Sequence, residues 1–392
     1  MKRDQWGSSV HIPDFLGVER DGEPWSELWY GTHPDGPTQS GSGAALRDLI
    51  AADPSGSLGE EIVYAFGTQL PYLAKVIAAS HALSLQVHPT KEIAREGYLR
   101  EELLGVERTS PERSYRDMNH KPEMLYALTD FEALVGFRVP RKARRLLEDL
   151  DGELAENLRR RLRLATVRGG LRSLVAWLFD PDSPVTRESI EEFVAACARR
   201  LEEGSSPSVR TDRMIARLSA THMGDPGLVV AFLMNPVSLR PGECVYIPPR
   251  MIHSYSSGMA IEVMASSDNV VRAGLTTKHV DAAQLVEIAE FSALPPVRVA
   301  AEHPAESTER FLAPAQEFEL SVTTVSGGEV TVPGEGPRIV IAVDGDVRVR
   351  TEPSPGSIEQ AELRAGEAIF VAASEGALAV SGSGRIVQCA TP

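Results

Sequence analysis

Cysteine is scarce in this sequence, and long apolar runs are missing. The three cysteines, Cys197, Cys244 and Cys389, are too few and too far apart for a disulfide framework or a thiolate metal site, so we expect a reducing compartment. No apolar stretch approaches the roughly 20 residues that a membrane-spanning helix needs. The first residues are polar and do not form the apolar core of a signal peptide. These absences predict a cytoplasmic protein without a membrane partner.

Positive charge is also in short supply. The chain has 40 Lys and Arg against 55 Asp and Glu, which gives a formal net charge of −15. A nucleic-acid partner calls for a basic surface, so we expect none. A small anionic substrate stays compatible with this charge, because a pocket needs only two or three well-placed Lys or Arg residues. At about 150 residues per domain, the 392 residues predict two or three domains.

The amino-acid composition changes twice along the chain. Residues 1–137 are rich in Gly, Pro and short apolar runs, which is typical of strands and loops, and we expect at least one helix, around Gln69 to Ala82. Residues 138–223 are dense in Arg, Glu, Leu and Ala and predict a helical insert, with one helix running from an N-cap at Thr186 to a stop at Gly204. From Leu228 onward the pattern favours strands again, including the run LVVAFLMNPVSLRPG.

An internal repeat indicates that one β-architecture occurs twice. The segment LRPGECVYIPPR (239–250) is echoed by LRAGEAIFVAAS (363–374), with Gly and Glu followed by alternating apolar residues in both. His253 stands three residues after the first segment, whereas Ala377 stands at the same distance after the second. We therefore expect the second copy to keep the fold without the chemistry.

These patterns predict a mainly β protein with an α insert, built from two jelly-roll, cupin-like β-barrels plus a helical domain. The expected catalytic domain is discontinuous and comprises residues 1–137 and 224–300. The helical insert covers residues 138–223, and a C-terminal jelly roll without a metal site covers residues 301–392.

Four segments carry polar residues that apolar packing does not explain. The segment LSLQVHP (83–89) alternates, so that Ser84, Gln86 and His88 share one face of a strand. The other three are DMNHKPEM, with Lys121 and Glu123, YIPPRMIHSY, with His253 after a double proline, and AIEVMASSDNVVRAG, with Glu262 and Arg272.

Two imidazoles, a carboxylate and an amide oxygen form a four-ligand set for a first-row divalent metal. The candidates are Gln86, His88, Glu123 and His253. Imidazole disfavours Ca²⁺ and Mg²⁺, and the absence of thiolate disfavours a structural zinc finger, so Zn²⁺ is the best single assignment. Gln86 is the unusual member, because amide oxygens are weak zinc ligands. The alternative is a polar strand face that is hydrogen-bonded and binds no metal.

Six segments, taken together and in order, closely resemble the type I phosphomannose isomerases, the zinc-dependent mannose-6-phosphate isomerases. They are WGSS, EPWSELWYGTHPDGP, LSLQVHPTKEIA, DMNHKPEMLYAL, LRPGECVYIPPRMIHSYSSG and IEVMASSDNVVRAGLTTKHVD. They cover the N-terminal and middle β regions, while the insert and the C-terminal region match by position and type more than by sequence. The chain departs from the family pattern at Asp4-Gln5-Trp6, where Tyr-Ala-Trp is common, and at TTK, where TPK is usual.

The resemblance implies a function and a site. The implied activity is the interconversion of mannose 6-phosphate and fructose 6-phosphate, with one zinc per chain on Gln86, His88, Glu123 and His253. It also places Ser84 toward the substrate phosphate, Lys121 and Arg272 along the pocket, and Glu262 near the sugar. Lys91 is a secondary candidate for the phosphate.

Moving a proton between C2 and C1 through an enediol needs a base and a group that stabilises charge on O1 and O2. We expect zinc and Arg272 to share that charge and Glu262 to act as the base. A zinc-bound water or Lys121 are rival bases, and Glu262 could instead be structural.

Three other functions stay open on the sequence. They are isomerisation of another hexose or hexose phosphate, an iron-dependent cupin oxygenase, and a non-catalytic cupin that binds a sugar phosphate. Gln86, Lys121 and Arg272 argue against oxygen chemistry, which needs open metal positions and no polyol-binding charges. We expect a monomer.

Overall fold

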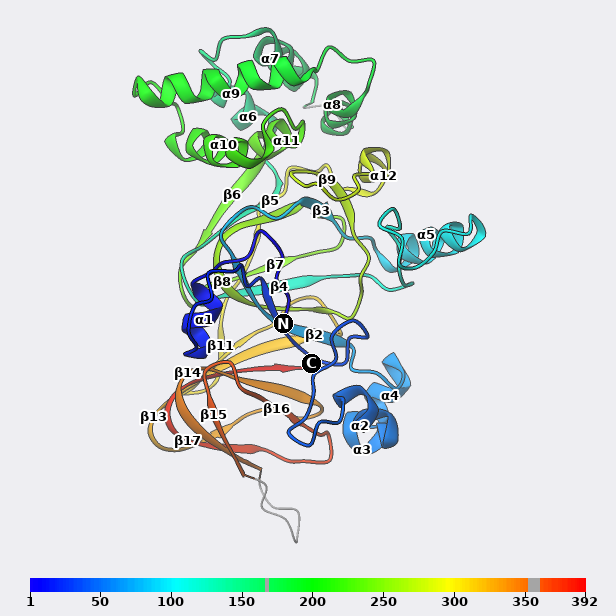
Figure 1. Ribbon diagram of the computed structural model, residues 1–392, viewed down its shortest axis with the longest axis vertical. Helices are drawn as coiled ribbons and strands as arrows, with labels where there is room; N and C mark the ends of the chain where they lie inside the picture. The colour runs from blue at the N-terminus through cyan, green and yellow to red at the C-terminus, as the bar shows by residue number, and fades with distance from the viewer. Residues whose placement is uncertain (166–168, 352–359) are drawn as a thin grey trace.

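The computed structural model describes residues 1–165, 169–351 and 360–392. Its long axis runs through three layers: a group of helices, a first sheet and a second sheet (Figure 1). All paired strands of both sheets are antiparallel. The chain is thus mostly antiparallel β-structure with added helices, as the composition of its segments predicted.

Ten strands form the first sheet. They are β1 (Glu27–Tyr30), β2 (Tyr72–Ala79), β3 (Leu85–Val87), β4 (Glu123–Ala127), β5 (Phe131–Phe137), β6 (Met234–Leu239), β7 (Cys244–Ile247), β8 (His253–Ala265), β9 (Val271–Gly274) and β10 (Val297–Val299). The order is β1-β2-β8-β4-β7-β10, while β3 pairs with β8 and β9, and β5 pairs with β6 and β8. The long strand β8 therefore contacts β2, β3, β4 and β5, and it gathers segments that are far apart in the sequence.

The helix expected around Gln69 to Ala82 is wrong, because this segment is strand β2. All eight residues of β2 are buried and all but Lys75 are hydrophobic, so no strand-like alternation shows in the sequence. A short apolar run of this kind cannot be assigned to a helix or a strand by its periodicity alone.

Among the described residues, six helices lie between β5 and β6, five of them within residues 138–223 and the sixth after residue 223. They are α6 (Pro140–Leu146), α7 (Glu153–Leu164), α8 (Gly170–Phe179), α9 (Arg187–Glu202), α10 (Val209–His222) and α11 (Gly227–Leu233). The Thr186 side chain accepts a hydrogen bond from the backbone N–H of Ser189, which confirms Thr186 as the N-cap of α9. The prediction of a strand from Leu228 is wrong. Residues 227–233 form α11, another fully buried apolar run, and strand β6 begins only at Met234.

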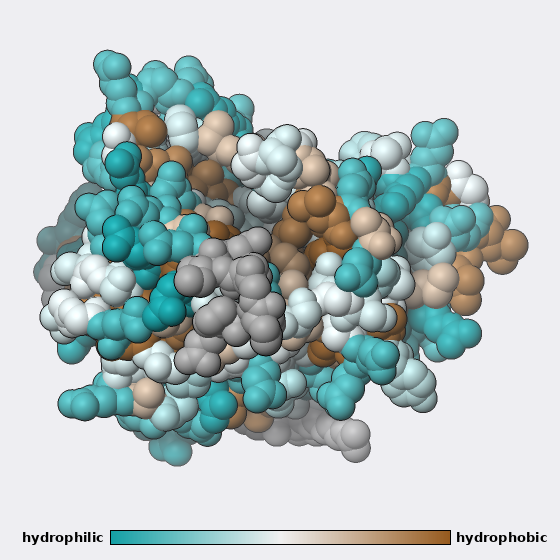
Figure 2. All heavy atoms as spheres, turned by 90° about the horizontal axis from the view of Figure 1, so that it is seen from below, coloured by the Kyte–Doolittle hydropathy of each residue, from teal (hydrophilic) through white to brown (hydrophobic). Residues whose placement is uncertain are grey.

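In the described part of the chain, seven strands form the second sheet. They are β11 (Glu302–Ala305), β12 (Thr308–Phe311), β13 (Glu319–Val332), β14 (Arg338–Thr351), β15 (Gln360–Arg364), β16 (Ala368–Val371) and β17 (Leu378–Ala390). The order is β11-β12-β13-β17-β14-β15, with β16 paired to β14. Figure 2 looks at this end of the molecule, where hydrophilic side chains surround smaller apolar patches.

The sequence repeat forms the same local structure in both sheets. Each copy is a strand, a tight turn with a glycine at positive φ, and a second strand: β6 to β7 through Gly242, and β15 to β16 through Gly366. In both turns the carboxylate of the following Glu accepts a hydrogen bond of 2.8 Å from the backbone N–H of the Arg before the turn. The two segments are therefore structural counterparts.

The two sheets share one hydrophobic core. This core includes Tyr72 and Val76 from the first sheet together with Leu320, Ile341 and Val387 from the second. The buried hydroxyl of Tyr72 crosses the boundary and donates to the backbone carbonyl of Cys389 at 2.7 Å. The second sheet is thus packed directly against the first.

The remaining helices lie at the periphery. They are α1 (His11–Leu16), α2 (Leu46–Ala52), α3 (Pro54–Leu58), α4 (Glu60–Phe66), α5 (Lys91–Leu103) and α12 (Ala282–Ile288). Figure 1 shows α2, α3 and α4 beside the second sheet and α5 projecting from the side of the first. In the described part of the chain, no helix is both long and apolar enough to cross a membrane.

Candidate metal centre

Strand pairing brings three of the polar segments together. Gln86 on β3 lies opposite His253 at the start of β8, and also neighbours Arg272 on β9. Glu123 begins β4, which pairs with the other half of β8. His88 follows β3 directly. The four predicted ligands therefore come from three separate segments that β8 brings side by side.

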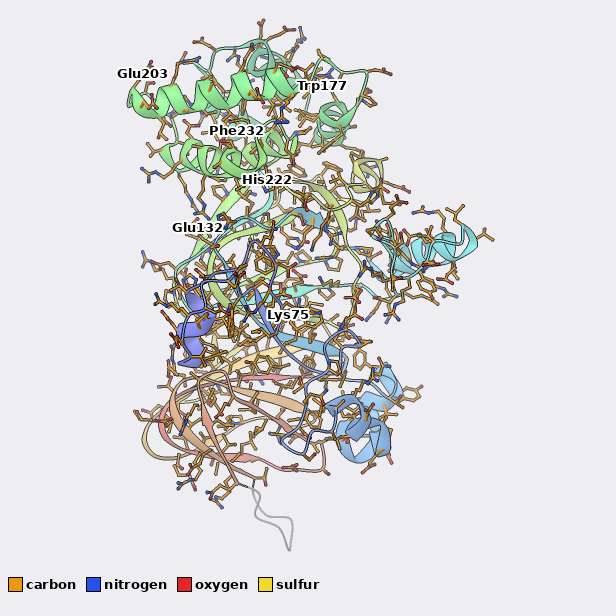
Figure 3. All side chains as sticks on the ribbon, in the orientation of Figure 1. Lys75, Glu132, Trp177, Glu203, His222 and Phe232 are labelled. Carbon is orange, nitrogen blue, oxygen red and sulfur yellow. The ribbon has the colours of Figure 1, made fainter. Side chains whose placement is uncertain are left out.

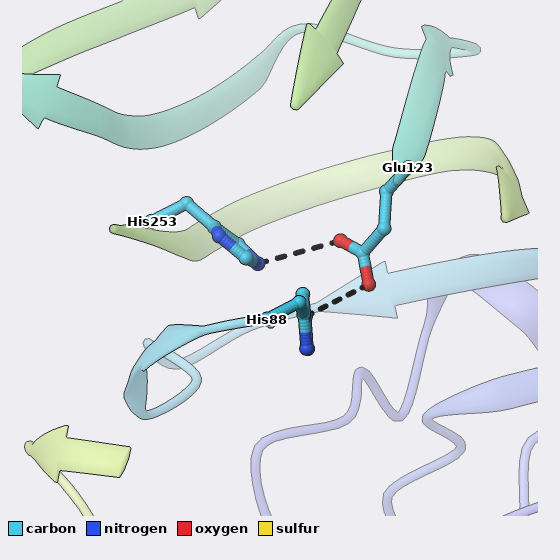
Figure 4. Close-up of side chains that lie close together, drawn as sticks. All are labelled: His88, Glu123 and His253. Carbon is cyan, nitrogen blue, oxygen red and sulfur yellow. Dashed lines mark ion pairs between the residues drawn. The ribbon is translucent and has the colours of Figure 1, made fainter. Parts of the chain in front are cut away.

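Two imidazoles face one carboxylate in the interior of the first sheet (Figure 4). The Nε2 atom of His88 lies 3.1 Å from Oε1 of Glu123, and Nε2 of His253 lies 3.3 Å from Oε2. All three side chains are at most 2% exposed. Such a closely packed group of ionisable side chains needs a compensating partner, because unpaired buried charge is costly.

The hydrogen bonds of the two Nδ1 atoms determine which imidazole nitrogens can bind a cation. Nδ1 of His88 donates to the carbonyl of Asn269 at 2.7 Å, and Nδ1 of His253 donates to the carbonyl of Met251 at 2.9 Å. Each Nε2 therefore presents a lone pair to Glu123. Burial lowers the pKa of His88 to about 4. The ring therefore does not carry a second proton on Nε2 that could form a hydrogen bond to Glu123. Lone pairs and a carboxylate converge on one point, which is the arrangement of a cation site.

Gln86 completes a set of four donors. Its amide nitrogen lies 3.2 Å from Nε2 of His253, and its amide oxygen lies 3.5 Å from the hydroxyl of Ser84. A half-turn of the amide exchanges these two atoms and directs the oxygen into the cluster, while the Ser84 hydroxyl can accept as well as donate. Two imidazole nitrogens, a carboxylate and an amide oxygen fit a four-coordinate first-row divalent cation.

Asn269 holds the surroundings of His88 in place. This fully buried side chain accepts hydrogen bonds from the backbone N–H groups of Arg116 and Asp117 at 2.7 and 3.1 Å. It donates to the carbonyls of Asp117 and Asn119, both at 2.8 Å. Because the Asn269 carbonyl also accepts from His88, one residue links a predicted ligand to the loop before Lys121. Sequence reasoning missed Asn269.

Two more side chains contact the carboxylate of Glu123. The hydroxyl of Tyr255 donates to Oε2 at 2.7 Å, and Nζ of Lys121 lies 3.0 Å from Oε1. Burial by itself raises the pKa of Glu123, but the charge of Lys121 opposes burial, and this pKa lies well below its usual value. Glu123 is therefore ionised, as a metal ligand must be.

Glu262 is paired with a lysine that sequence reasoning also missed. Lys75, labelled in Figure 3, is 6% exposed in β2, and its Nζ lies 3.1 Å from Glu262 and 3.5 Å from Glu27. Burial raises the pKa of Glu262, and Lys75 opposes this rise. The available signal was a single Lys inside the apolar run YLAKVIAA, which is unusual for a buried segment.

Not all of the predicted Lys and Arg side chains contact the four candidate metal ligands. The guanidinium of Arg272 makes no ion pair or hydrogen bond within the described residues, and burial, together with Arg116, lowers its pKa. Lys91 is exposed at the first residue of α5. No hydrogen bond or ion pair in the described part of the chain joins Lys91 to the four donors, so the structure does not gather it with them.

A second group of His33, Asp35 and Asp268 differs from this centre. Nε2 of His33 lies 3.0 Å from Asp268, while Nδ1 accepts from the backbone N–H of Asp35. The Nε2 proton is therefore available for Asp268, and this contact is satisfied without a cation. Of these two groups, only the one formed by His88, Glu123 and His253 leaves imidazole lone pairs facing a carboxylate.

Comparison with known proteins agrees with this geometry. Residues 1–140 match the model of the phosphomannose isomerase type I catalytic domain. The mannose-6-phosphate isomerase of Escherichia coli K12 is 33% identical, with 98% of this chain and 96% of the relative covered. Mannose-6-phosphate isomerase 1 of Arabidopsis thaliana is 32% identical, with 89% of this chain and 81% of the relative covered.

Solved structures give the same result over the full length. A mannose 6-phosphate isomerase bound with zinc and yttrium has a TM-score of 0.88 and 30% identity, covering 100% of this chain and 97% of that one. The Salmonella typhimurium mannose 6-phosphate isomerase, solved with its substrate fructose 6-phosphate and zinc, has a TM-score of 0.88, 29% identity and the same coverage.

Proposed function

The chain belongs to the mannose-6-phosphate isomerase family, and from this premise we propose how its own residues carry the reaction. The reaction is the metal-dependent interconversion of mannose 6-phosphate and fructose 6-phosphate. The observation that supports this conclusion is the pair of buried imidazole lone pairs that face Glu123, because a shared cation would satisfy both lone pairs and the carboxylate.

Zinc is the cofactor, and Gln86, His88, Glu123 and His253 are the residues that would hold it. When bound there, zinc supplies a Lewis acid that stabilises negative charge on the substrate oxygens O1 and O2. The protein's part is to keep both histidines in the Nδ1–H form and to exclude water from the ligands.

Glu262 is our candidate for the base that moves the proton between C1 and C2. Its burial raises its pKa toward the working range of a general base, and Lys75 fixes the orientation of its carboxylate at 3.1 Å. Lys121, which lies beside Glu123, and a metal-bound water are the alternatives. A purely structural Glu262 is the remaining possibility.

Arg272, Lys121, Ser84 and, in a secondary role, Lys91 are our candidates for the substrate's charged oxygens. Arg272 is the strongest of them, because its guanidinium has no carboxylate partner in the described part of the chain and lies near the charge of Arg116. An arginine without an acidic partner can bind an anion such as an enediolate oxygen or a phosphate.

The finer architecture also belongs to this proposal. We propose that each sheet is a cupin-like jelly roll and that residues 1–137 with 224–300, 138–223 and 301–392 are the three domains. Support comes from the matching turns of the repeat and from the helices that lie between the two halves of the first sheet. The monomeric state and the cytoplasmic location stay predictions.

A coupled assay tests the function. We expect the purified protein to convert mannose 6-phosphate to fructose 6-phosphate, to lose this activity on chelation and to regain it when Zn²⁺ is added. A zinc-loaded, folded sample without this activity would contradict the substrate assignment, and a panel of other aldose phosphates and free aldoses would then identify the sugar.

A further inference from the structure

Glu317, in the C-terminal part of the chain, is a buried carboxylate with a single long-range partner. It precedes β13, is 4% exposed, and its Oε1 accepts from Nε2 of His120 at 2.6 Å. Its Oε2 is buried and has no hydrogen-bond partner among the described residues. Burying a carboxylate costs free energy, so this side chain is expected to serve the one contact that it makes.

That contact reaches the loop that carries Lys121. His120 directly precedes Lys121, and residues 117–122 belong to no helix or strand. Inside the first sheet, Asn269 holds the beginning of this loop through Asp117 and Asn119. Asn269 makes no hydrogen bond to His120. Glu317, in the segment just before β13 of the second sheet, contacts His120 instead.

We propose that the C-terminal sheet positions the substrate-binding loop of the first sheet through the contact between Glu317 and His120. This inference rests on the proposed function, since it assigns a role to Lys121 in the isomerase site. Glu317 is then a positioning residue: it fixes His120, and His120 determines where the neighbouring Lys121 points. The second copy of the β-architecture, which has Ala377 where the first has His253, is retained as a support for the first.

Other contacts between the two sheets provide a matched control. The hydroxyl of Tyr30 donates to the carbonyl of Gly366 at 2.8 Å, and this hydrogen bond also joins the first sheet to the second. Tyr30 belongs to β1, which pairs with β2 and is separate from the loop of residues 117–122. A variant that only loosens the packing of the two sheets is therefore Tyr30→Phe.

The test compares zinc-loaded wild type with Glu317→Ala, Glu317→Gln and Tyr30→Phe. We expect Glu317→Ala to lower kcat/KM by about tenfold, mainly through KM, because one charge-assisted hydrogen bond is lost. Glu317→Gln keeps an acceptor for His120 and recovers part of this loss. Zinc content stays at the wild-type value in every variant. Equal losses in Glu317→Ala and Tyr30→Phe, or no loss in Glu317→Ala, would overturn the proposal.

Two further measurements separate positioning from stability. In the His120→Ala background, Glu317→Ala is expected to cost no further activity, whereas additive losses would contradict an effect through His120. Hydrogen exchange of the amides of residues 117–121 is expected to accelerate in Glu317→Ala and to stay unchanged in Tyr30→Phe. Because exchange needs no turnover, an inactive wild type would refute the proposed function alone, while unchanged exchange in Glu317→Ala would refute the positioning role alone.

Discussion

Nε2 of His88 lies 3.1 Å from Oε1 of Glu123, and Nδ1 of the same ring lies 2.7 Å from the carbonyl of Asn269. The ring proton of His88 is on Nδ1, where it is donated to Asn269, and Glu123 is ionised beside Lys121. Two acceptors at this separation repel one another unless a cation lies between them or near both. On this contact we base the proposal that the buried group holds a metal, and it underlies the first of the predictions below.

Removing the metal should destabilise the folded protein as well as abolish turnover. Chelation leaves the lone pairs of His88 and His253 facing Glu123, and bound zinc stabilises the folded state by about 2.7 kcal/mol when free zinc is about 100 times its Kd. Thermal unfolding with chelator and with added Zn²⁺ measures this effect. His253→Ala should remove most of the zinc-dependent rise in Tm, and an equal rise in this variant would contradict the ligand assignment.

Asn269→Ala should weaken zinc binding although Asn269 is not a ligand. The substitution releases the loop at Asp117 and disturbs the carbonyl that orients His88, and loss of such an outer partner typically lowers metal affinity by about 10- to 100-fold. Competition with a chromogenic chelator gives the affinity. Asn235→Ala is the control, because Asn235 also bonds to backbone carbonyls, including that of Phe137 at 3.0 Å, but belongs to β6 and contacts β5. Similar zinc affinities in both variants would exclude this role for Asn269.

Glu262→Gln should lower kcat by at least about 100-fold with zinc retained, since general base catalysis contributes on that order. The amide keeps the shape of the side chain and removes its proton affinity. Steady-state kinetics together with zinc content per chain make the measurement. Glu132→Gln provides a control, because Glu132, labelled in Figure 3, is a half-buried carboxylate outside the site and pairs with Arg210 at 2.9 Å. Wild-type turnover in zinc-loaded Glu262→Gln would leave Lys121 or a metal-bound water as the base.

Arg200→Met should destabilise the helical insert strongly without changing the metal centre. The guanidinium of Arg200 bonds to Asp212 at 2.6 Å through Nε, and both residues are buried, so the variant leaves an unpaired buried carboxylate at a cost of about 3–5 kcal/mol. Urea unfolding measures the loss. The exposed pair of Arg187 and Glu191 on α9 gives the contrast, since Arg187→Ala should cost less than about 1 kcal/mol. A similar loss of unfolding free energy in Arg200→Met and Arg187→Ala would contradict the prediction that the buried ion pair costs more to break than the exposed one.

The sequence alone determined the features whose signals are local. The alternation of LSLQVHP, the double proline before His253 and the polar HKPE segment each mark an exception to apolar packing within a few residues, so the four candidate ligands could be named. The N-cap at Thr186 and the repeated turns at Gly242 and Gly366 are equally local, because they depend on one side chain and the backbone next to it.

Only the tertiary structure decided the features that depend on distant partners. β2 and α11 are both short apolar runs, and the choice between strand and helix came from pairing with β8 for one and packing among the insert helices for the other. Lys75 and Asn269 are single polar residues whose partners stand far along the chain, Glu262 for the first and Asp117 for the second. Glu317 reaches His120 across the boundary between two sheets. A local pattern shows that a side chain is unusual, but its charge partner and hydrogen-bond geometry exist only once the chain has brought separate strands together.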